Sequence, residues 1–144
     1  MARLFKPYIS WRARWYALRV LMGTQIAEGE WVKQFEHEFN QRFGFHHSLA
    51  LNSGTSALEL AYELAGIRAG DHVVTPVLTC TATNIPLVRR GAQIVFADID
   101  YDLNINIEDV KRKITKKTKA IVFVHFGGNN RGLKELVEIY REKR

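Results

Sequence analysis

The sequence contains a single cysteine, Cys80, three prolines and no apolar run of the length that a membrane span requires. One cysteine excludes an internal disulfide framework and favours a reducing compartment. No signal-peptide pattern opens the chain. These absences predict a cytoplasmic protein.

Several motifs with well-defined chemistry are also missing. No Gly-x-Gly-x-x-Gly follows the first expected strand, which weighs against a Rossmann-type nucleotide binder, and the Walker A and zinc-hydrolase spacings are absent. His37, His46 and His47 lack a cysteine or a third well-spaced ligand beside them. We therefore expect these histidines to be solvated or capping residues rather than metal ligands.

The residues that are present describe an ordinary globular chain, 47% hydrophobic and 25% charged, of a length that suits one main domain. The net charge of +6 is unevenly placed, because Met1–Met22 contains five basic residues and no acidic one. In the same segment Trp11, Trp15 and Leu18 would form one apolar stripe on a helix. We interpret 1–22 as a basic aromatic segment and 23–144 as the main domain.

Three partners are compatible with Met1–Met22. Packing against the protein itself or a partner subunit is the favoured interpretation. Contact with an anionic membrane surface comes second, and binding to nucleic acid is a distant third.

Short apolar runs alternate with helical patterns from residue 48 onward. The expected strands are Ser48–Asn52, His72–Thr75, Gln93–Ala97 and Ala120–His125. The expected helices are Gln25–Phe43, Ser56–Ala65, Ala82–Arg89, Ile107–Ile114 and Gly132–Lys143. Strands spaced by helices predict an α/β fold with a mainly parallel sheet in a three-layer αβα arrangement, with ligands at the carboxyl ends of the strands.

A turn of small residues follows the first expected strand. Gly54 could adopt the positive φ of a sharp reversal, and Ser56 and Glu59 have the spacing of a capping box. Backbone N–H groups at such a helix start form an anion site, which a phosphate commonly occupies. Taken alone, the turn also fits an ordinary strand-to-helix connection.

Seven blocks occur in a specific order, and together they resemble the amino-terminal part of the DegT/DnrJ/StrS-type sugar aminotransferases, pyridoxal-phosphate (PLP) enzymes of fold type I. The resemblance covers roughly residues 21–128. The blocks are Phe35–Gly44, Leu51–Leu58, Gly70–Pro76, Gly91–Ala92, Phe96–Asp100, Ile114–Ile121 and Val124–Gly128.

The resemblance implies that Gly54, Thr55 and Ser56 hold the phosphate of PLP. Cys80 stands where the family has an aromatic residue that stacks on the pyridine ring, and a thiol cannot reproduce that contact. A buried structural cysteine and a cofactor contact are both compatible with this position. His125 could line the site, whereas we expect Asp98 to be a structural hydrogen-bonding group.

The resemblance also implies that no catalytic residue lies within this chain. The lysine that forms a Schiff base with PLP, the acidic partner of the pyridine nitrogen and the small carboxy-terminal domain would all lie downstream. The complete enzyme would move an amino group, commonly from glutamate, to a nucleotide-linked keto-sugar, and it would be a homodimer that binds no nucleic acid. The alternative is a non-catalytic homologue that binds a phosphate ligand or pairs with a full-length subunit.

Overall fold

The structure is a computed structural model that describes residues 6–24, 26 and 28–142. The chain divides into two compact units, one up to Ala50 and one from Leu51 onward. The separate status that the sequence suggests for residues 1–22 stays a prediction.

The first unit contains the helices α1 (Trp11–Leu21) and α2 (Glu30–Phe43). The hydroxyl of Ser10 accepts a hydrogen bond from the N–H of Ala13 (3.2 Å) and thereby caps α1. Gly44 ends α2 with a left-handed φ of 69°, which glycine adopts without strain. The expected helix from Gln25 begins only at Glu30, after Gly29 in a non-helical conformation, and Gln25 itself lies outside the described residues.

The second unit has three layers, as the sequence predicts. Its elements are α3 (Gly54–Leu64), β1 (His72–Pro76), α4 (Thr81–Arg89), β2 (Gln93–Ala97), α5 (Ile107–Lys113), β3 (Thr118–Ile121), the short 3₁₀ helix η1 (Phe126–Gly128) and α6 (Leu133–Glu142). The sheet order is β2-β1-β3, and both pairs are parallel. Helices α3 and α4 cover one face of the sheet, while α5 and α6 cover the other.

The central strand β1 is buried on both faces, which its continuous apolar sequence predicts. Successive side chains of a strand point to opposite faces, so Val73 and Val74 enter different core clusters. Val73 packs with Leu87 of α4, and Val74 packs with Val110 of α5. All four side chains are fully buried, so two cores hold the sheet between the helix layers.

The expected strand Ser48–Asn52 does not form. A strand requires a neighbouring strand for its backbone hydrogen bonds, and the three strands of the described sheet pair only with one another. The N–H of Ala50 instead donates to the Glu36 carboxylate (2.7 Å), and the Ser48 hydroxyl donates to the Glu36 carbonyl. This segment is therefore bonded to α2 rather than to the sheet.

The last strand is shorter than Ala120–His125 and begins earlier. The N–H of Val122 donates to the carbonyl of Val74 (2.8 Å), which is the last bond of the β1–β3 ladder. The next N–H group of β1 that would face β3 belongs to residue 76, but Pro76 has no N–H to donate. The ladder therefore stops, and the chain leaves the sheet toward η1.

Candidate functional site

The start of α3 is the candidate anion site. Ser53 is extended (φ −158°, ψ 156°), and its hydroxyl accepts a hydrogen bond from the N–H of Ser56 (3.1 Å). Gly54 is then the first helical residue, with a φ outside the left-handed region. The predictions of a positive φ at Gly54 and of a capping box from Ser56 were therefore wrong. The cap lies three residues earlier, and Glu59 pairs with Arg89 (3.2 Å).

Hydroxyl groups hold this turn in place. The hydroxyl of Ser56 donates to the side-chain oxygen of Asn52 (2.9 Å) and lies 2.9 Å from that of Ser53. The hydroxyl of Ser56 therefore has both of its partners within the turn. It stabilises the shape of the turn and does not offer a free donor to a ligand. The sequence placed Asn52 and Ser53 in this turn but did not assign them these hydrogen bonds, although the Asn-Ser pair before a helix was a visible capping signal.

The geometry at this helix start fits a phosphate group. The N–H groups of Gly54 and Thr55 have no acceptor among the described residues, as is usual for the first turn of a helix. The first turn contains no acidic residue. A Cβ built on Gly54 would meet no atom within 4 Å, so the backbone is open on that side. Free donors, the positive end of the helix dipole and open space together suit an anion.

Cys80 and His125 lie at exposed positions after the ends of two neighbouring strands. Cys80 is the N-cap residue of α4, its side chain makes no capping bond, and its thiol is exposed and free. The ring of His125 packs edge-on against Phe123, with the ring centroids 5.0 Å apart. The sequence left open a buried structural role for Cys80, which its exposure contradicts.

Chain topology brings these positions to one edge of the sheet. Cys80 follows the end of β1 and His125 follows the end of β3, so both lie at the carboxyl edge of the sheet. The end of α3 leads through a short loop into the start of β1, so the start of α3 lies at the opposite edge, which is the carboxyl edge. Open α/β sheets bind ligands at this edge. Within the described residues, no hydrogen bond joins the turn at residues 53–56 to Cys80 or to His125. The structure thus supplies a common edge and no direct contact.

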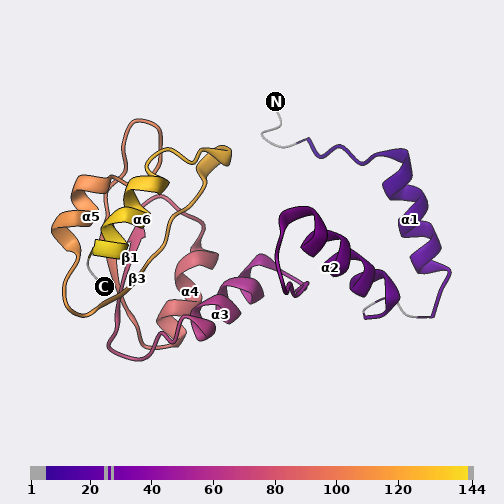
Figure 1. The fold of residues 1–144 in the computed structure, drawn as a ribbon, viewed down its shortest axis with the longest axis horizontal. Coiled ribbons are helices and arrows are strands. Elements are labelled where there is room, and N and C mark those ends of the chain that lie inside the picture. The colour runs from indigo at the N-terminus through magenta and orange to yellow at the C-terminus, as the bar shows by residue number, and fades with distance from the viewer. Residues whose placement is uncertain (1–5, 25, 27, 143–144) are drawn as a thin grey trace. The chain divides into compact units, whose positions relative to one another are not determined.

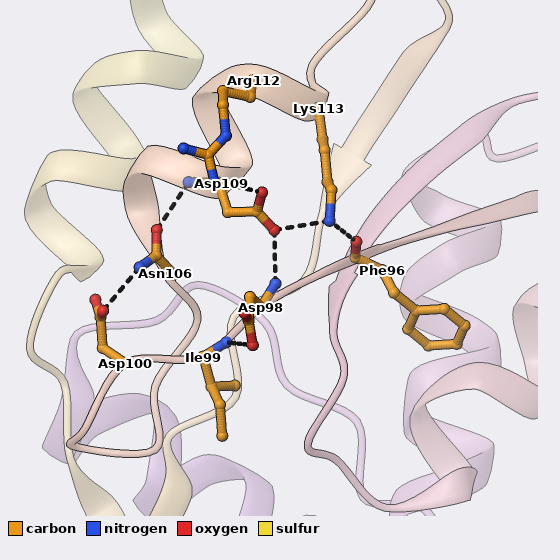
Figure 2. A network of polar contacts seen from close by, with 8 residues as sticks. All are labelled: Phe96, Asp98, Ile99, Asp100, Asn106, Asp109, Arg112 and Lys113. Carbon is orange, nitrogen blue, oxygen red and sulfur yellow. Dashed lines mark hydrogen bonds and ion pairs between the residues drawn. The ribbon is translucent and has the colours of Figure 1, made fainter.

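A polar network fixes the chain at the end of β2, as Figure 2 shows. The N–H of Asp98 donates to the Asp109 carboxylate (2.7 Å), and the Asp98 carboxylate accepts from the N–H of Ile99 (2.8 Å). Asp98 is therefore a structural hydrogen-bonding group, as expected. Lys113 donates to Asp109 (2.7 Å) and to the carbonyl of Phe96 (2.6 Å), so it bridges α5 and β2.

Asp109 is the centre of that network. The hydrogen bond from Lys113, followed by the bond from the Asp98 N–H, holds the pKa of Asp109 well below its usual range, although burial acts in the opposite direction. Arg112 also donates to this carboxylate (2.9 Å). Asp109 therefore remains charged and anchors the loop that leaves β2.

Two polar side-chain atoms near the carboxyl edge are buried without a hydrogen-bond partner in the described part of the chain, which the sequence did not predict. The hydroxyl of Thr75 is fully buried near the end of β1, and the side-chain oxygen of Asn84 is buried in α4; neither has a hydrogen-bond partner among the described residues. A polar residue directly before Pro76, at the end of an apolar strand, was the signal for Thr75.

The described residues offer neither a cluster of metal ligands nor a membrane-spanning helix. They contain no group of three or more His, Cys, Asp or Glu side chains that could hold a metal ion. The helices they form are too short or too polar to cross a membrane.

A parallel α/β sheet with an open, uncharged helix start at its carboxyl edge is typical of proteins that bind phosphorylated ligands. The sequence itself identifies the group more narrowly. The chain belongs to the DegT/DnrJ/EryC1/StrS aminotransferase family, whose model matches residues 10–144. This match confirms the resemblance and extends it on both sides of residues 21–128.

Two relatives have names that refer to the synthesis of GDP-perosamine and to the biosynthesis of spore coat polysaccharide. The chain is 35% identical to GDP-perosamine synthase of Vibrio cholerae over 144 residues, which cover 99% of this chain and 39% of that protein. It is also 44% identical to the spore coat polysaccharide biosynthesis protein SpsC of Bacillus subtilis. That match extends over 106 residues, which cover 73% of this chain and 27% of SpsC.

A solved structure matches the fold closely. A putative sugar aminotransferase of Streptococcus pneumoniae in its PLP form superposes with a TM-score of 0.86 at 28% identity, over 95% of this chain and 35% of that one. The fold is therefore part of a fold type I domain, and PLP is the cofactor of the family. The chain spans less than two fifths of the length of these relatives.

Proposed function

We propose that this chain forms the phosphate-binding part of a PLP-dependent sugar aminotransferase. The complete enzyme would transfer an amino group from an amino acid, with glutamate as the donor, to a nucleotide-linked keto-sugar in amino-sugar or polysaccharide biosynthesis. Family membership and the names of the relatives support this activity. We further propose a homodimer in the cytoplasm.

The open start of α3 is the observation that carries the proposal. Gly54 and Thr55 would bind the phosphate through their N–H groups, and the bonds of Ser56 to Asn52 and Ser53 would hold the turn in shape before the ligand arrives. Cys80 and His125 would line the same edge. The cofactor, when bound, supplies an electron sink for bond cleavage next to the amino group.

The lysines of α5 are poorly suited to covalent chemistry with the cofactor. A lysine that attacks a carbonyl needs a neutral amine, which a lowered pKa favours. Lys111 instead donates to Glu108 (2.7 Å) and Glu135 (2.9 Å), and these bonds raise its pKa. Lys113 is held by Asp109. The proposal therefore assigns no catalytic role to Lys111 or Lys113.

The test uses pyridoxine 5′-phosphate, which carries the phosphate of the cofactor and no aldehyde, and unphosphorylated pyridoxine as the control ligand. We expect the amide resonances of Gly54 and Thr55 to shift only with the phosphorylated compound. Gly54→Ala should weaken binding by about tenfold, because the added methyl group occupies the open side of the turn and impairs charge-assisted hydrogen bonds.

The same variant controls for folding. The new Cβ meets no protein atom, and the backbone at residue 54 is helical, so the melting temperature should stay equal or rise slightly. Equal affinity for the two ligands, or unchanged binding in Gly54→Ala, would show that this turn does not bind the phosphate. A non-catalytic homologue would bind the phosphorylated compound in the same way. An assay of transamination by the complete protein distinguishes the two hypotheses, because the non-catalytic homologue would show no activity.

A further inference from the structure

Helix α1 exposes a row of apolar side chains. Trp11, Trp15, Leu18 and Met22 follow one another at intervals of four, three and four residues, the spacing at which side chains of a helix share one face. Their exposed fractions are 73%, 55%, 50% and 79%. We call these four residues the α1 stripe. A helix of a globular protein usually buries such a stripe, so an exposed one marks a contact surface.

The contacts between α1 and α2 use the other side of the helix. The ring of Tyr16 packs edge-on against Trp31 of α2, with the ring centroids 5.8 Å apart. Val20, one turn after Tyr16, is partly buried, while the other residues of α1 are exposed. At about 3.6 residues per turn, Tyr16 and Val20 lie across the helix from the α1 stripe. Helix α2 therefore leaves the stripe uncovered.

Arginine side chains border the α1 stripe on both sides. The helical periodicity places Arg14 at one margin, and Arg12 and Arg19 at the other. The guanidinium of Arg12 also lies over the ring of Trp11, 5.6 Å from its centroid. Met1–Met22 contains no acidic residue that could neutralise these margins. The surface is therefore apolar at its centre and positive along both sides.

This arrangement suits the surface of an anionic lipid bilayer. A helix that lies in such a surface inserts its apolar side chains below the headgroups, while arginine side chains extend back to the lipid phosphates. Tryptophan is enriched at that depth, because its ring is apolar and its N–H can bind a headgroup. Cations near the anionic surface add electrostatic attraction. With 11 residues, α1 is too short to span a bilayer, so it would lie in the plane of the surface.

A second copy of this chain fits the α1 stripe less well. Two α1 helices packed along their stripes would bring the arginines of both copies side by side, and like charges repel. The segment Met1–Met22 offers no carboxylate to pair with them. A helix of 11 residues is also short for a stable pair of isolated helices in water.

A nucleic acid also matches this surface less well. Binding to a phosphate backbone is strongest where cations gather on one face. The apolar stripe instead separates Arg14 from Arg12 and Arg19. The tryptophan and leucine side chains of the stripe would then lie against the most polar part of the ligand.

We propose that the α1 stripe and its arginine margins form a docking surface for an anionic lipid bilayer. The sequence alone favours packing of this segment against protein. The uncovered stripe and the cations on both sides of it change that preference. This surface is independent of phosphate binding at α3.

The first test uses the 144-residue chain and vesicles of phosphatidylglycerol and phosphatidylcholine in equal parts. Vesicles of phosphatidylcholine alone are the control. We expect the chain to sediment with the anionic vesicles only, and this binding should weaken at high salt, which screens the attraction. Excess pyridoxine 5′-phosphate should not release the chain, because it occupies the start of α3 rather than α1.

Tryptophan fluorescence identifies the face that meets the lipid. The chain contains three tryptophans, of which Trp11 and Trp15 lie in the stripe and Trp31 lies on α2. Brominated acyl chains quench the emission of nearby tryptophans. We expect quenching to remain in Trp31→Phe and to disappear in the double variant Trp11→Phe/Trp15→Phe. Phenylalanine keeps an apolar aromatic ring at each position, so both variants should still bind.

A pair of double variants tests the charge. Arg12→Gln/Arg14→Gln removes one cation from each margin of the stripe, so it should weaken binding to the anionic vesicles by about tenfold or more. Arg131→Gln/Lys134→Gln removes the same charge from exposed positions outside α1 and should bind like the unmodified chain. Comparable thermal melts of the two variants would show that both fold.

Several results would overturn the proposal. They are a failure to sediment with the anionic vesicles, equal binding to both kinds of vesicle, unchanged binding in Arg12→Gln/Arg14→Gln, and quenching of Trp31 in the variant that lacks Trp11 and Trp15. Self-association of the chain without vesicle binding would show that a second copy covers the stripe. Preferential binding to duplex DNA, lost in Arg12→Gln/Arg14→Gln, would assign the surface to nucleic acid, and the proposal would then also be wrong.

Discussion

Asp109 shows how a single carboxylate can fix the end of a strand. It accepts from the N–H of Asp98, from Lys113 and from Arg112, and its side chain is only 8% exposed. We expect Asp109→Ala to lower the free energy of unfolding by about 1–3 kcal/mol, because the partly buried N–H of Asp98 loses its acceptor, and Lys113 loses its ion-pair partner. Arg112→Ala is the control, since that side chain is 72% exposed and should contribute about 0–1 kcal/mol. Urea denaturation measures both.

The lowered pKa of Asp109 also predicts a dependence of stability on pH. A carboxylate whose pKa is lower in the folded state stabilises the fold above its unfolded pKa of about 3.9 and loses that contribution as the pH falls through the folded pKa. The stability of the unmodified chain should therefore fall below about pH 4, and Asp109→Asn should show a flatter profile. Equal slopes for the two proteins would contradict this assignment.

Single residues also show what sequence reasoning could locate and what it could not. Gly54, Thr55 and Ser56 were chosen from a capping pattern and a family motif, and the structure places them at a helix start. The exact cap was misassigned, because Ser53 and Ser56 both fit the pattern and only the backbone conformation distinguishes them. The position of Thr75 directly before Pro76 is visible in the sequence, but a lone threonine in an apolar strand does not reveal whether its hydroxyl has a partner.

At the scale of elements, the cap of α3 can be tested directly. Ser53→Ala removes the oxygen that accepts the N–H of Ser56, so it should lower stability by about 1 kcal/mol, whereas Ser53→Gly should cost only a few tenths. Thermal denaturation of the two variants gives the comparison. A larger loss in the glycine variant would mean that side-chain capping does not stabilise this turn.

The strands that sequence predicted best are those whose partners lie nearby in the chain. β1 and β2 were placed almost to the residue, since continuous apolar runs bounded by glycine are a local signal. Ser48–Asn52 has a similar local pattern, but it forms no strand because none of the three strands pairs with it. Strand formation depends on a neighbour, and a short apolar run contains no information about that neighbour.

At the scale of the whole molecule, the family assignment predicts a chemical property of the lysines. When the chain is mixed with PLP and reduced with borohydride, we expect no single lysine to be labelled preferentially. The pKa of Lys111 is raised by Glu108 and Glu135, and Lys113 is bound to Asp109. Mass spectrometry of peptides should therefore show weak, scattered labelling, and a stoichiometric adduct at one lysine would contradict the absence of a catalytic lysine.

The position of Pro76 has a further consequence for the carboxyl edge. β1 lies between β2 and β3 in the sheet. The chain segments that follow β1 and its neighbours therefore diverge at the point where β1 ends. Any other residue at this position would bring an N–H toward the Val122 carbonyl and allow β1 and β3 to remain paired for one more bond. One imino acid thus determines where two parallel strands separate, and with it where the segments that lead to Cys80 and His125 diverge.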